Sequence, residues 1–149
     1  DKTIKITNSQ NVENKSYRAF NVTTKEYPGF ATDLQSPLVT FLTQCEGESA
    51  VTETIFEGRF KYVNDLIDLG ARISVIDNNK AIVSGPTPLH QSPNNHLTAH
   101  DIRAGFAIVL ACLIAKGNFT VSNIHLIDRG YESLETRLRA LGADIRREK

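Results

Sequence analysis

The sequence predicts a mixed α/β fold in a single domain. Segments with the alternating pattern of strands take turns along the chain with apolar segments at helical spacing. A chain of 149 residues, 40% of them hydrophobic, is long enough to build one core. Several short motifs of the first half recur in the same order in the second half. We therefore expect residues 1–149 to form one domain made of two copies of a βαβαββ unit, at roughly 17–85 and 86–149.

The first half carries the signals of strand, helix, strand, helix and hairpin in that order. Pro28-Gly29 makes a tight corner after the early strands, and a glycine follows each predicted helix, where glycine is favoured. Two β-rich arms flank the turn residues 77–79, which predicts a hairpin. We expect strands at 3–7, 17–23 and 49–55, helices at about 34–46 and 62–69, and the hairpin at 72–83.

The second half begins with an irregular connection at 85–100. This stretch holds three of the five prolines and three of the four histidines. The helix expected at 101–116 is almost wholly apolar, so it should be buried on most sides. A strand at 118–125, a turn at 128–130, a helix at 131–141 and a last strand at 143–147 complete the prediction.

The cysteines and histidines do not form a metal site by their spacing. His96 and His100 are spaced to share a helix face, but no carboxylate or thiolate nearby completes a ligand set. Cys45 and Cys112 lie inside apolar helical runs and have no partner at metal-ligand or CxxC spacing. We expect no metal and no cofactor, and two buried free thiols in a reducing, cytoplasmic compartment.

The charge balance argues against nucleic acid or a membrane as a partner. Lys plus Arg and Asp plus Glu are equal at 17 each, so the chain has no net attraction for polyanions. No apolar stretch is long enough to span a bilayer, and the first residues lack the pattern of a signal peptide. Because the chain contains no Met and opens directly on a strand-like segment, we expect it to be a piece of a longer protein.

Matching corners of the two halves place acids and arginines together. Asp33 and Asp101 each open an apolar helix, and Arg103 follows Asp101 by two residues. Arg59 and Arg129 lie in or beside the matching turns. An arginine at a helix start is unfavourable, because the helix dipole already places positive charge there. A bound anion between the two would explain why an arginine stands at this position.

Two interpretations of these residues are open. Asp33 could accept a proton from a substrate hydroxyl, or it could simply cap the following helix together with Thr32. The three arginines could bind a substrate with phosphate and carboxylate groups. They could instead make local salt bridges, pairing Arg59 with Glu57, Arg103 with Asp101, and Arg129 with Asp128.

Four segments in the same order carry a family resemblance: YPGFATDLQSPL, TETIFEGRF, DIRAG and IDRGYESLETRLRALGADI. From about Tyr17 onward, the chain resembles the bacterial UDP-N-acetylglucosamine 1-carboxyvinyltransferases. The resemblance implies βαβαββ-like units of an inside-out α/β barrel. It also implies transfer of enolpyruvyl from phosphoenolpyruvate to the 3'-hydroxyl of UDP-N-acetylglucosamine (UDP-GlcNAc), with release of phosphate, in the first committed step of peptidoglycan synthesis.

The resemblance also implies roles for six residues. Asp33 would be the base at the sugar hydroxyl, Asp101 would help shape the reacting centre, and Ile55 or its backbone would touch the sugar nucleotide. Three arginines would bind phosphoenolpyruvate or phosphate: Arg59, Arg103 and Arg129.

The chain departs from the family where other catalytic groups are expected. Cys45 and Cys112 do not match the family's catalytic Cys, and the family's Lys-Asn pair has no counterpart. We therefore expect a missing N-terminal domain to be a partner, and the isolated fragment to be inactive. Two alternatives remain: a shikimate-pathway enolpyruvyl transferase, or a non-catalytic module of cyclase-like fold that binds a nucleotide or an RNA end. Convergence of the three guanidinium groups on one anion-sized space would separate these possibilities.

Overall fold

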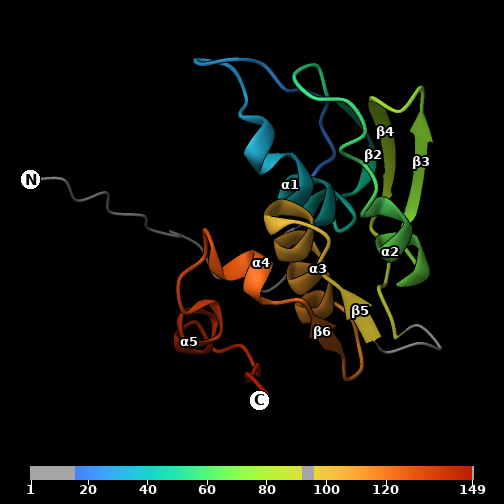
Figure 1. Cartoon of the computed structure of the whole chain (residues 1–149). Helices are drawn as coiled ribbons and strands as arrows, with labels where there is room; N and C mark the ends of the chain where they lie inside the picture. Colours follow the sequence, from blue (N-terminus) through green and yellow to red (C-terminus); the bar gives the residue numbers. More distant parts are fainter. Residues whose placement is uncertain (1–15, 92–95, 149) are drawn as a thin grey trace, which may run out of the picture.

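The computed structural model describes residues 16–91 and 96–148. The strand predicted at 3–7 lies outside these residues. Within them the structure mixes helices and strands, as the sequence predicts, and Figure 1 shows their arrangement. The elements are β1 (Val22–Thr23), the 3-10 helix η1 (Thr32–Leu34), α1 (Gln35–Leu42), β2 (Gly47–Thr52), α2 (Val63–Asp68), β3 (Arg72–Ile76), β4 (Lys80–Gly85), β5 (His96–Thr98), α3 (Ile102–Ile114), β6 (Thr120–Ser122), α4 (His125–Asp128) and α5 (Leu134–Ala140).

The larger sheet belongs to the first half of the chain. Its strand order is β1-β2-β4-β3, with β1 parallel to β2 and the other pairs antiparallel. The predicted hairpin is confirmed as β3 and β4, in register from Arg72 opposite Ser84 to Ile76 opposite Lys80. Asp77 and Asn78 take positive φ angles of 53° and 56°, the conformation that a tight two-strand turn requires.

A two-stranded parallel sheet in the second half corrects the prediction for residues 85–100. His96–Thr98 forms β5 and pairs with Thr120–Ser122, so this stretch is not irregular throughout. Short length and neighbouring polar residues concealed the strand in the sequence. The strand predicted at 118–125 is correspondingly shorter, because the chain enters α4 at His125.

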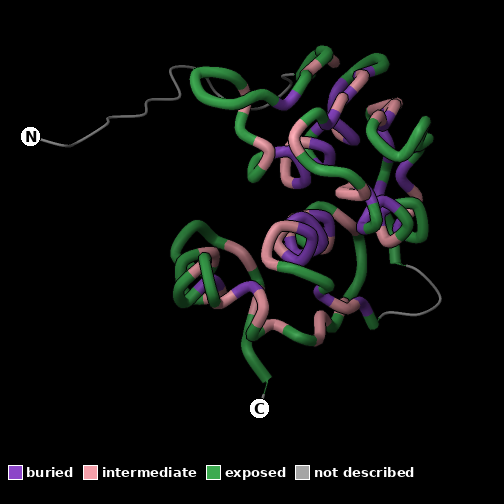
Figure 2. The backbone as a smooth tube through the Cα atoms, turned by 45° about the horizontal axis from the view of Figure 1, so that its top comes forward, coloured by how far each residue is buried: buried purple, intermediate pink, exposed green. Residues whose placement is uncertain are grey.

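Helix α3 lies centrally, between α1 and the larger sheet on one side and α4 on the other (Figure 1). Its middle is buried, as predicted, and Ile108 is 0% exposed (Figure 2). Its last residues are not: Leu113 and Ile114 are 38% and 40% exposed. Gly105 lets the helix approach its neighbours closely, since an added Cβ would lie 2.7 Å from Ile127 Cγ1.

Helices α1 and α3 pack directly on each other. The Thr40 hydroxyl on α1 donates a hydrogen bond of 3.2 Å to the Ala107 carbonyl on α3. Because α1 follows Asp33 and α3 carries Arg103, this packing brings the two predicted helix starts to the same region of the fold.

The predicted cap at Thr32 and Asp33 is wrong. Both residues lie in η1, ahead of α1, and no side chain caps either helix. Their side chains have partners elsewhere: the Thr32 hydroxyl donates to Glu53, and the Asp33 carboxylate accepts from Arg103. Tertiary partners have therefore replaced the local bonds that the sequence pattern suggests.

Two more boundaries of the first half differ from the prediction. The strand predicted at 17–23 is regular only in β1. Just before β1, at residues 20 and 21, side chains take the place of backbone hydrogen-bond partners. The Phe20 amide donates to Ser49 Oγ at 3.1 Å, and the Ala50 amide donates to Asn21 Oδ1 at 2.8 Å. The first helix ends at Leu42, and the end of β4 packs closely on the chain that follows the helix: a Cβ added at Gly85 would lie within 2.9 Å of the carbonyl oxygens of Leu42, Thr43 and Cys45.

The last strand, predicted at 143–147, is wrong. Within the described residues 143–148, no strand forms. Ile145 packs on the small core around Ile127, and Arg147 binds the carboxylates of Asp128 and Glu135. The helix predicted at 131–141 starts only at Leu134, because Ser133 takes a left-handed conformation with φ 50°.

The two halves follow a related order of elements. The first runs β1-α1-β2-α2-β3-β4, and the second runs β5-α3-β6-α4-α5 without a closing hairpin in the described residues. Their origin as copies of one unit stays a prediction. Both thiols are free; Cys45 is buried as expected, whereas Cys112 is only half-buried, and burial raises the pKa of Cys112 to about 12.

Candidate active site

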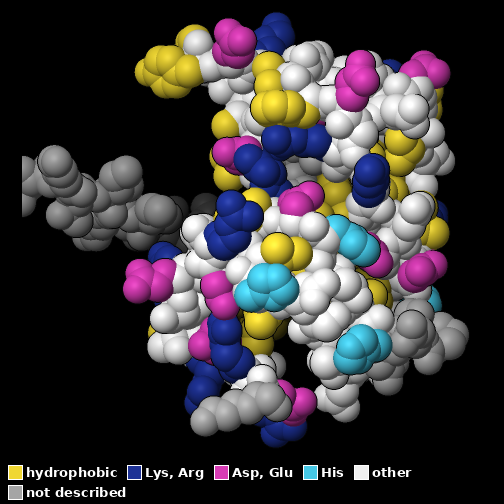
Figure 3. Space-filling view, viewed as in Figure 1, with side chains coloured by type: hydrophobic (Ala, Val, Ile, Leu, Met, Phe, Trp, Pro, Cys, Tyr) yellow, Lys and Arg dark blue, Asp and Glu magenta, His cyan; other side chains and the backbone are white. Residues whose placement is uncertain are grey.

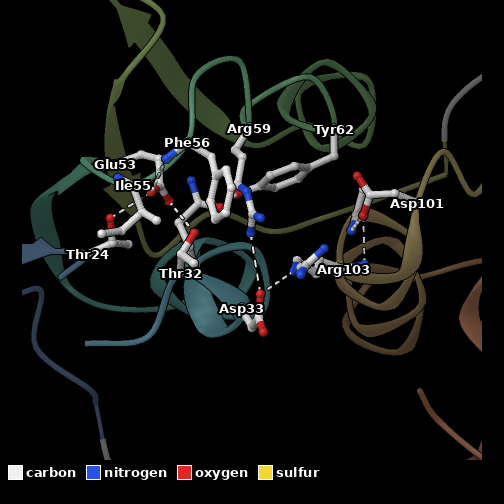
Figure 4. Close-up of polar contacts among 12 residues, drawn as sticks. Thr24, Thr32, Asp33, Glu53, Ile55, Phe56, Arg59, Tyr62, Asp101 and Arg103 are labelled. Carbon is white, nitrogen blue, oxygen red and sulfur yellow. Dashed lines mark hydrogen bonds and ion pairs between the residues drawn. The ribbon is translucent and has the colours of Figure 1, made fainter. Parts of the chain in front are cut away.

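Three predicted site residues from three separate segments meet at one carboxylate. Asp33 lies in η1, Arg59 in the turn after β2, and Arg103 in the first turn of α3. Asp33 Oδ1 accepts a hydrogen bond from Arg103 Nε at 2.5 Å and lies 3.5 Å from Arg59 Nη1 (Figure 4). The Asp33 side chain is 63% exposed, whereas those of Arg59 and Arg103 are 18% and 35% exposed. A solvent-accessible carboxylate thus stands beside two partly buried cations.

The arginines keep Asp33 ionised. The hydrogen bond from Arg103 is the largest influence and lowers the pKa of Asp33 below its ordinary value. Partial burial opposes this effect, and the charges of Arg103 and Arg59 add to it. A carboxylate held in this way is a weak proton acceptor until the guanidinium groups find another anion.

Arg59 is held by its own loop as well as by Asp33. Its guanidinium lies over the Phe56 ring, 4.1 Å from the ring centroid, in a cation–π contact. Its Nη1 atom is buried and has no hydrogen-bond partner among the described residues, and Asp33 Oδ1 lies 3.5 Å from it as an ion pair. Arg59 therefore keeps donor capacity for an anionic ligand.

Asp101 has a different position from Asp33. It is the N-cap of α3, and its Oδ1 accepts from the backbone amides of Arg103 at 2.7 Å and Ala104 at 2.9 Å. The alternative in which Arg103 forms a local salt bridge with Asp101 is therefore wrong, because the Asp101 carboxylate binds backbone amides and the Arg103 guanidinium binds Asp33. Asp101 instead fixes the backbone from which Arg103 reaches Asp33 (Figure 4).

Arg129 is not brought to Asp33. It is exposed at the end of α4, and among the described residues its side chain makes no ion pair or hydrogen bond with Asp33, Arg59 or Arg103. The expected local partner, Asp128, pairs with Arg147 at 2.7 Å instead. The next residue, Gly130, packs against Ile102, so the turn carrying Arg129 does lie against the first turn of α3.

Glu53 is a buried carboxylate that the sequence analysis missed. It is 2% exposed and accepts from the Thr24 and Thr32 hydroxyls and from the amides of Ile55 and Phe56. Burial alone would raise the pKa of Glu53, but these hydrogen bonds hold it below its ordinary value. Ile55, a predicted ligand contact, is thereby fixed through its amide. The glutamate stands in the TETIFEGRF segment, yet its burial could not be seen from sequence.

Tyr131 is a second residue that the sequence analysis missed. It stacks on Phe106 of α3, with ring centroids 4.2 Å apart. Burial raises the pKa of Tyr131, and the Asp33 carboxylate raises it further while Arg103 lowers it.

The described residues contain no group of three or more His, Cys, Asp or Glu side chains placed to hold a metal. His100 lies 3.6 Å from Asp65 and forms a pair, not a ligand set. In the part of the chain that the structure describes, no helix is long and apolar enough to cross a membrane. Basic and acidic side chains are interspersed on the face shown in Figure 3, without a large basic patch.

The α/β fold of the chain matches part of an enolpyruvyl transferase. The crystal structure of the enolpyruvyl transferase NikO from Streptomyces tendae matches with a TM-score of 0.80 at 36% identity, over 89% of this chain and 30% of that chain. The family model described as EPSP synthase (3-phosphoshikimate 1-carboxyvinyltransferase) matches residues 1–138. The chain belongs to this family.

Relatives within the family carry a more specific name. The UDP-N-acetylglucosamine 1-carboxyvinyltransferase of Thermobifida fusca is 47% identical over 91% of this chain, and that of Helicobacter pylori strain ATCC 700392 is 48% identical over 89%. These findings confirm the resemblance inferred from the four sequence segments. The chain spans about 30% of the length of these relatives.

Proposed function

We propose that the protein containing this sequence is a UDP-N-acetylglucosamine 1-carboxyvinyltransferase acting in peptidoglycan synthesis. Relatives with this name, at 47% and 48% identity, support the assignment. The observation that carries it in the structure is the placement of Asp33 beside Arg59 and Arg103. This arrangement joins a potential base to two groups that bind anions.

The proposed reaction uses both parts of this arrangement. The methylene carbon of the donor gains a proton, and the 3'-hydroxyl of the sugar loses its proton as its oxygen bonds to carbon 2. The new methyl group then loses a proton while the bond from carbon 2 to the phosphate oxygen breaks, which restores the double bond and releases phosphate. Asp33 would accept the hydroxyl proton. Arg59 and Arg103 would bind the phosphate or carboxylate of phosphoenolpyruvate, which orients the donor and stabilises the departing phosphate.

Substrate binding would also activate Asp33. An anion that takes the guanidinium groups weakens the interactions that lower the pKa of Asp33. The carboxylate then becomes a stronger proton acceptor only when the donor is in place. Proton transfer of this kind typically contributes ~10² to 10⁴ in rate.

The remaining site residues have supporting roles in this proposal. Ile55 contacts the sugar nucleotide from the loop that Glu53 fixes, and Asp101 shapes the reacting centre by holding the backbone of Arg103. Arg129 joins the donor site from the turn that packs against α3. Its exposed side chain, without an ion pair in the described residues, is available for such a ligand.

About 70% of the relatives' length has no counterpart in this chain. We propose that the further cations, the acid that protonates the donor and a closing loop lie in that remainder, in an N-terminal domain. The 149-residue chain by itself would then bind phosphoenolpyruvate or phosphate weakly and show no transferase turnover. The proposed location of the full-length protein is the cytoplasm.

Phosphate release from phosphoenolpyruvate tests the proposed function. The full-length protein that carries this sequence should release phosphate with UDP-GlcNAc, but not without an acceptor. Shikimate 3-phosphate is the comparison acceptor, because the family model carries the name of that enzyme. Release with shikimate 3-phosphate alone would assign the shikimate-pathway activity, and no release with either acceptor would favour a non-catalytic module.

A further inference from the structure

Glu53 is an unusual group to bury, because its charge has no cation beside it. Within the described residues no lysine, arginine or histidine forms an ion pair with it. Its four partners are neutral donors: the Thr24 and Thr32 hydroxyls, each at 2.8 Å, and the amides of Ile55 at 2.9 Å and Phe56 at 3.2 Å. A buried charge is costly unless hydrogen bonds replace its hydration. The four donors around Glu53 supply these bonds, so they stabilise an ionised carboxylate at this position.

The partners of Glu53 belong to the two segments that meet at the candidate active site. Thr32, bound by Oε2, is the residue directly before Asp33. Ile55 and Phe56, bound by Oε1, begin the loop that leads to Arg59. Figure 4 shows Glu53 between these segments. One carboxylate thus ties the Asp33 segment to the Arg59 loop.

The contacts continue from Glu53 to the reacting groups on both sides. On one side the Phe56 ring lies 4.1 Å from the Arg59 guanidinium, which lies 3.5 Å from Asp33. On the other side Thr32 joins Glu53 to Asp33 through one peptide bond. These contacts link the Asp33 segment and the Arg59 loop both at Glu53 and at the Asp33–Arg59 ion pair. A shift of either segment would therefore change the distance between Asp33 and Arg59.

We propose that Glu53 is a positioning residue, which fixes Asp33 relative to Arg59 by bonding Thr32 on one side and the backbone of Ile55 and Phe56 on the other. For the effect on turnover, this inference rests on the proposed function. The geometric part does not, because it concerns only the distance between two side chains of this chain.

Thr32→Val tests the inference most sharply. Valine keeps the shape of threonine and removes only the bond to Glu53 Oε2, while the other three bonds of Glu53 remain. Thr32→Ser restores a hydroxyl and should rescue the function. Thr87→Val is the control: like Thr32, Thr87 donates one side-chain hydrogen bond, here of 2.9 Å to the Ser84 carbonyl at the other end of the larger sheet.

The measurements are made on the full-length protein. In Thr32→Val we expect kcat to fall about tenfold to a hundredfold while the KM for UDP-GlcNAc changes little, because misplacement of a reacting group affects mainly the chemical step. Carbon-13 NMR should also show a higher pKa for Asp33, because its interaction with the guanidinium groups is weakened. Thr32→Ser and Thr87→Val should keep the wild-type kcat and Asp33 pKa.

Two results would overturn the inference. The first is a Thr32→Val protein that loses melting temperature like Thr87→Val but keeps its kcat and Asp33 pKa, because Glu53 would then only stabilise its loop. The second is failure of Thr32→Ser to rescue. Glu53→Ala removes all four bonds and should lower kcat more than Thr32→Val does. If Glu53→Ala does not fold, the result for Thr32→Val alone tests the inference. A wild-type protein without transferase activity would refute the proposed function, while the Asp33 pKa would still test the positioning.

Discussion

Two carboxylates near the candidate site stay ionised for different physical reasons. Asp33 is partly exposed and is held by guanidinium groups, chiefly by its hydrogen bond from Arg103. Glu53 is buried, and neutral hydroxyl and amide donors overcome the effect of burial. A substrate anion can compete for the arginines of Asp33, whereas the neutral donors of Glu53 are already bound to a buried carboxylate. Asp33 is therefore suited to gain and lose a proton during a reaction, whereas Glu53 is suited to remain ionised throughout.

Glu53 should make the protein sensitive to acid. Its pKa in the folded state is below the ordinary value, so it contributes stability above the unfolded-state pKa of about 4.3. That contribution is lost as the pH falls through the folded-state pKa. Glu53→Gln should therefore weaken the decline of the unfolding free energy between about pH 5 and pH 3.

Urea unfolding at a series of pH values measures this decline. Glu48→Gln, at an exposed position on β2, serves as the control and should follow the wild-type curve. An equal pH dependence for wild type and Glu53→Gln would show that Glu53 does not gain stability from ionisation in the fold.

The ion pairs of the site could not be predicted residue by residue. Asp33 and Arg103 are 70 positions apart, and only the packing of α1 on α3 brings them together. The sequence singled out both residues because each stands at a repeated corner. The local alternative paired arginines with near neighbours, but Asp101 is used by backbone amides and Asp128 by Arg147.

At the scale of elements, α3 shows how a helix start can serve both stability and function. Asp101 caps the helix with two backbone bonds, and the second residue of the helix supplies the arginine that reaches Asp33. Because an N-cap fixes the first turn, the direction of Arg103 depends on the same carboxylate. Loss of the cap should therefore affect both folding and the site.

Asp101→Ala should destabilise the protein by about 0.5–2 kcal/mol, because two amides at the start of α3 lose their acceptor. Asp101→Asn should remain close to wild type in stability, since asparagine caps helices about as well as aspartate. Denaturant unfolding of both variants checks this expectation. Equal destabilisation by alanine and asparagine would mean that the charge, and not the cap, is what matters.

Elements were predictable where the signal is local. The hairpin at residues 77–79 and the apolar run of α3 carry their own turn residues and periodicity, and both were predicted. Strands that exist only through a partner were not. β5 forms because β6 lies beside it, whereas residues 143–147 find no such neighbour in the described structure and bind carboxylates instead.

At the scale of the whole molecule, α3 connects the two halves of the chain. Its buried face packs on the core of the first half through Ile108 and on the smaller core around Ile127 through Val109. The sequence predicted this burial from composition alone. It could not predict that Leu113 and Ile114 remain exposed, because that depends on what the other elements cover.

Ile108→Ala should therefore cost about 2–5 kcal/mol of stability, because it removes a fully buried side chain from the central helix. Ile114→Ala, on the same helix and 40% exposed, is the matched control and should have a clearly smaller effect. Chemical unfolding of the two variants gives the comparison. Similar losses at the two positions would contradict a central place for α3.

The central claim is that Asp33 accepts the proton of the acceptor hydroxyl in enolpyruvyl transfer. Steady-state phosphate release by full-length Asp33→Asn tests it most directly, with Asp68→Asn on the exposed side of α2 as the control. We expect kcat of Asp33→Asn to fall by ~10² to 10⁴ because an amide cannot accept the proton, with the affinity for UDP-GlcNAc largely retained and the control unchanged. Turnover of Asp33→Asn near the wild-type rate would contradict the claim.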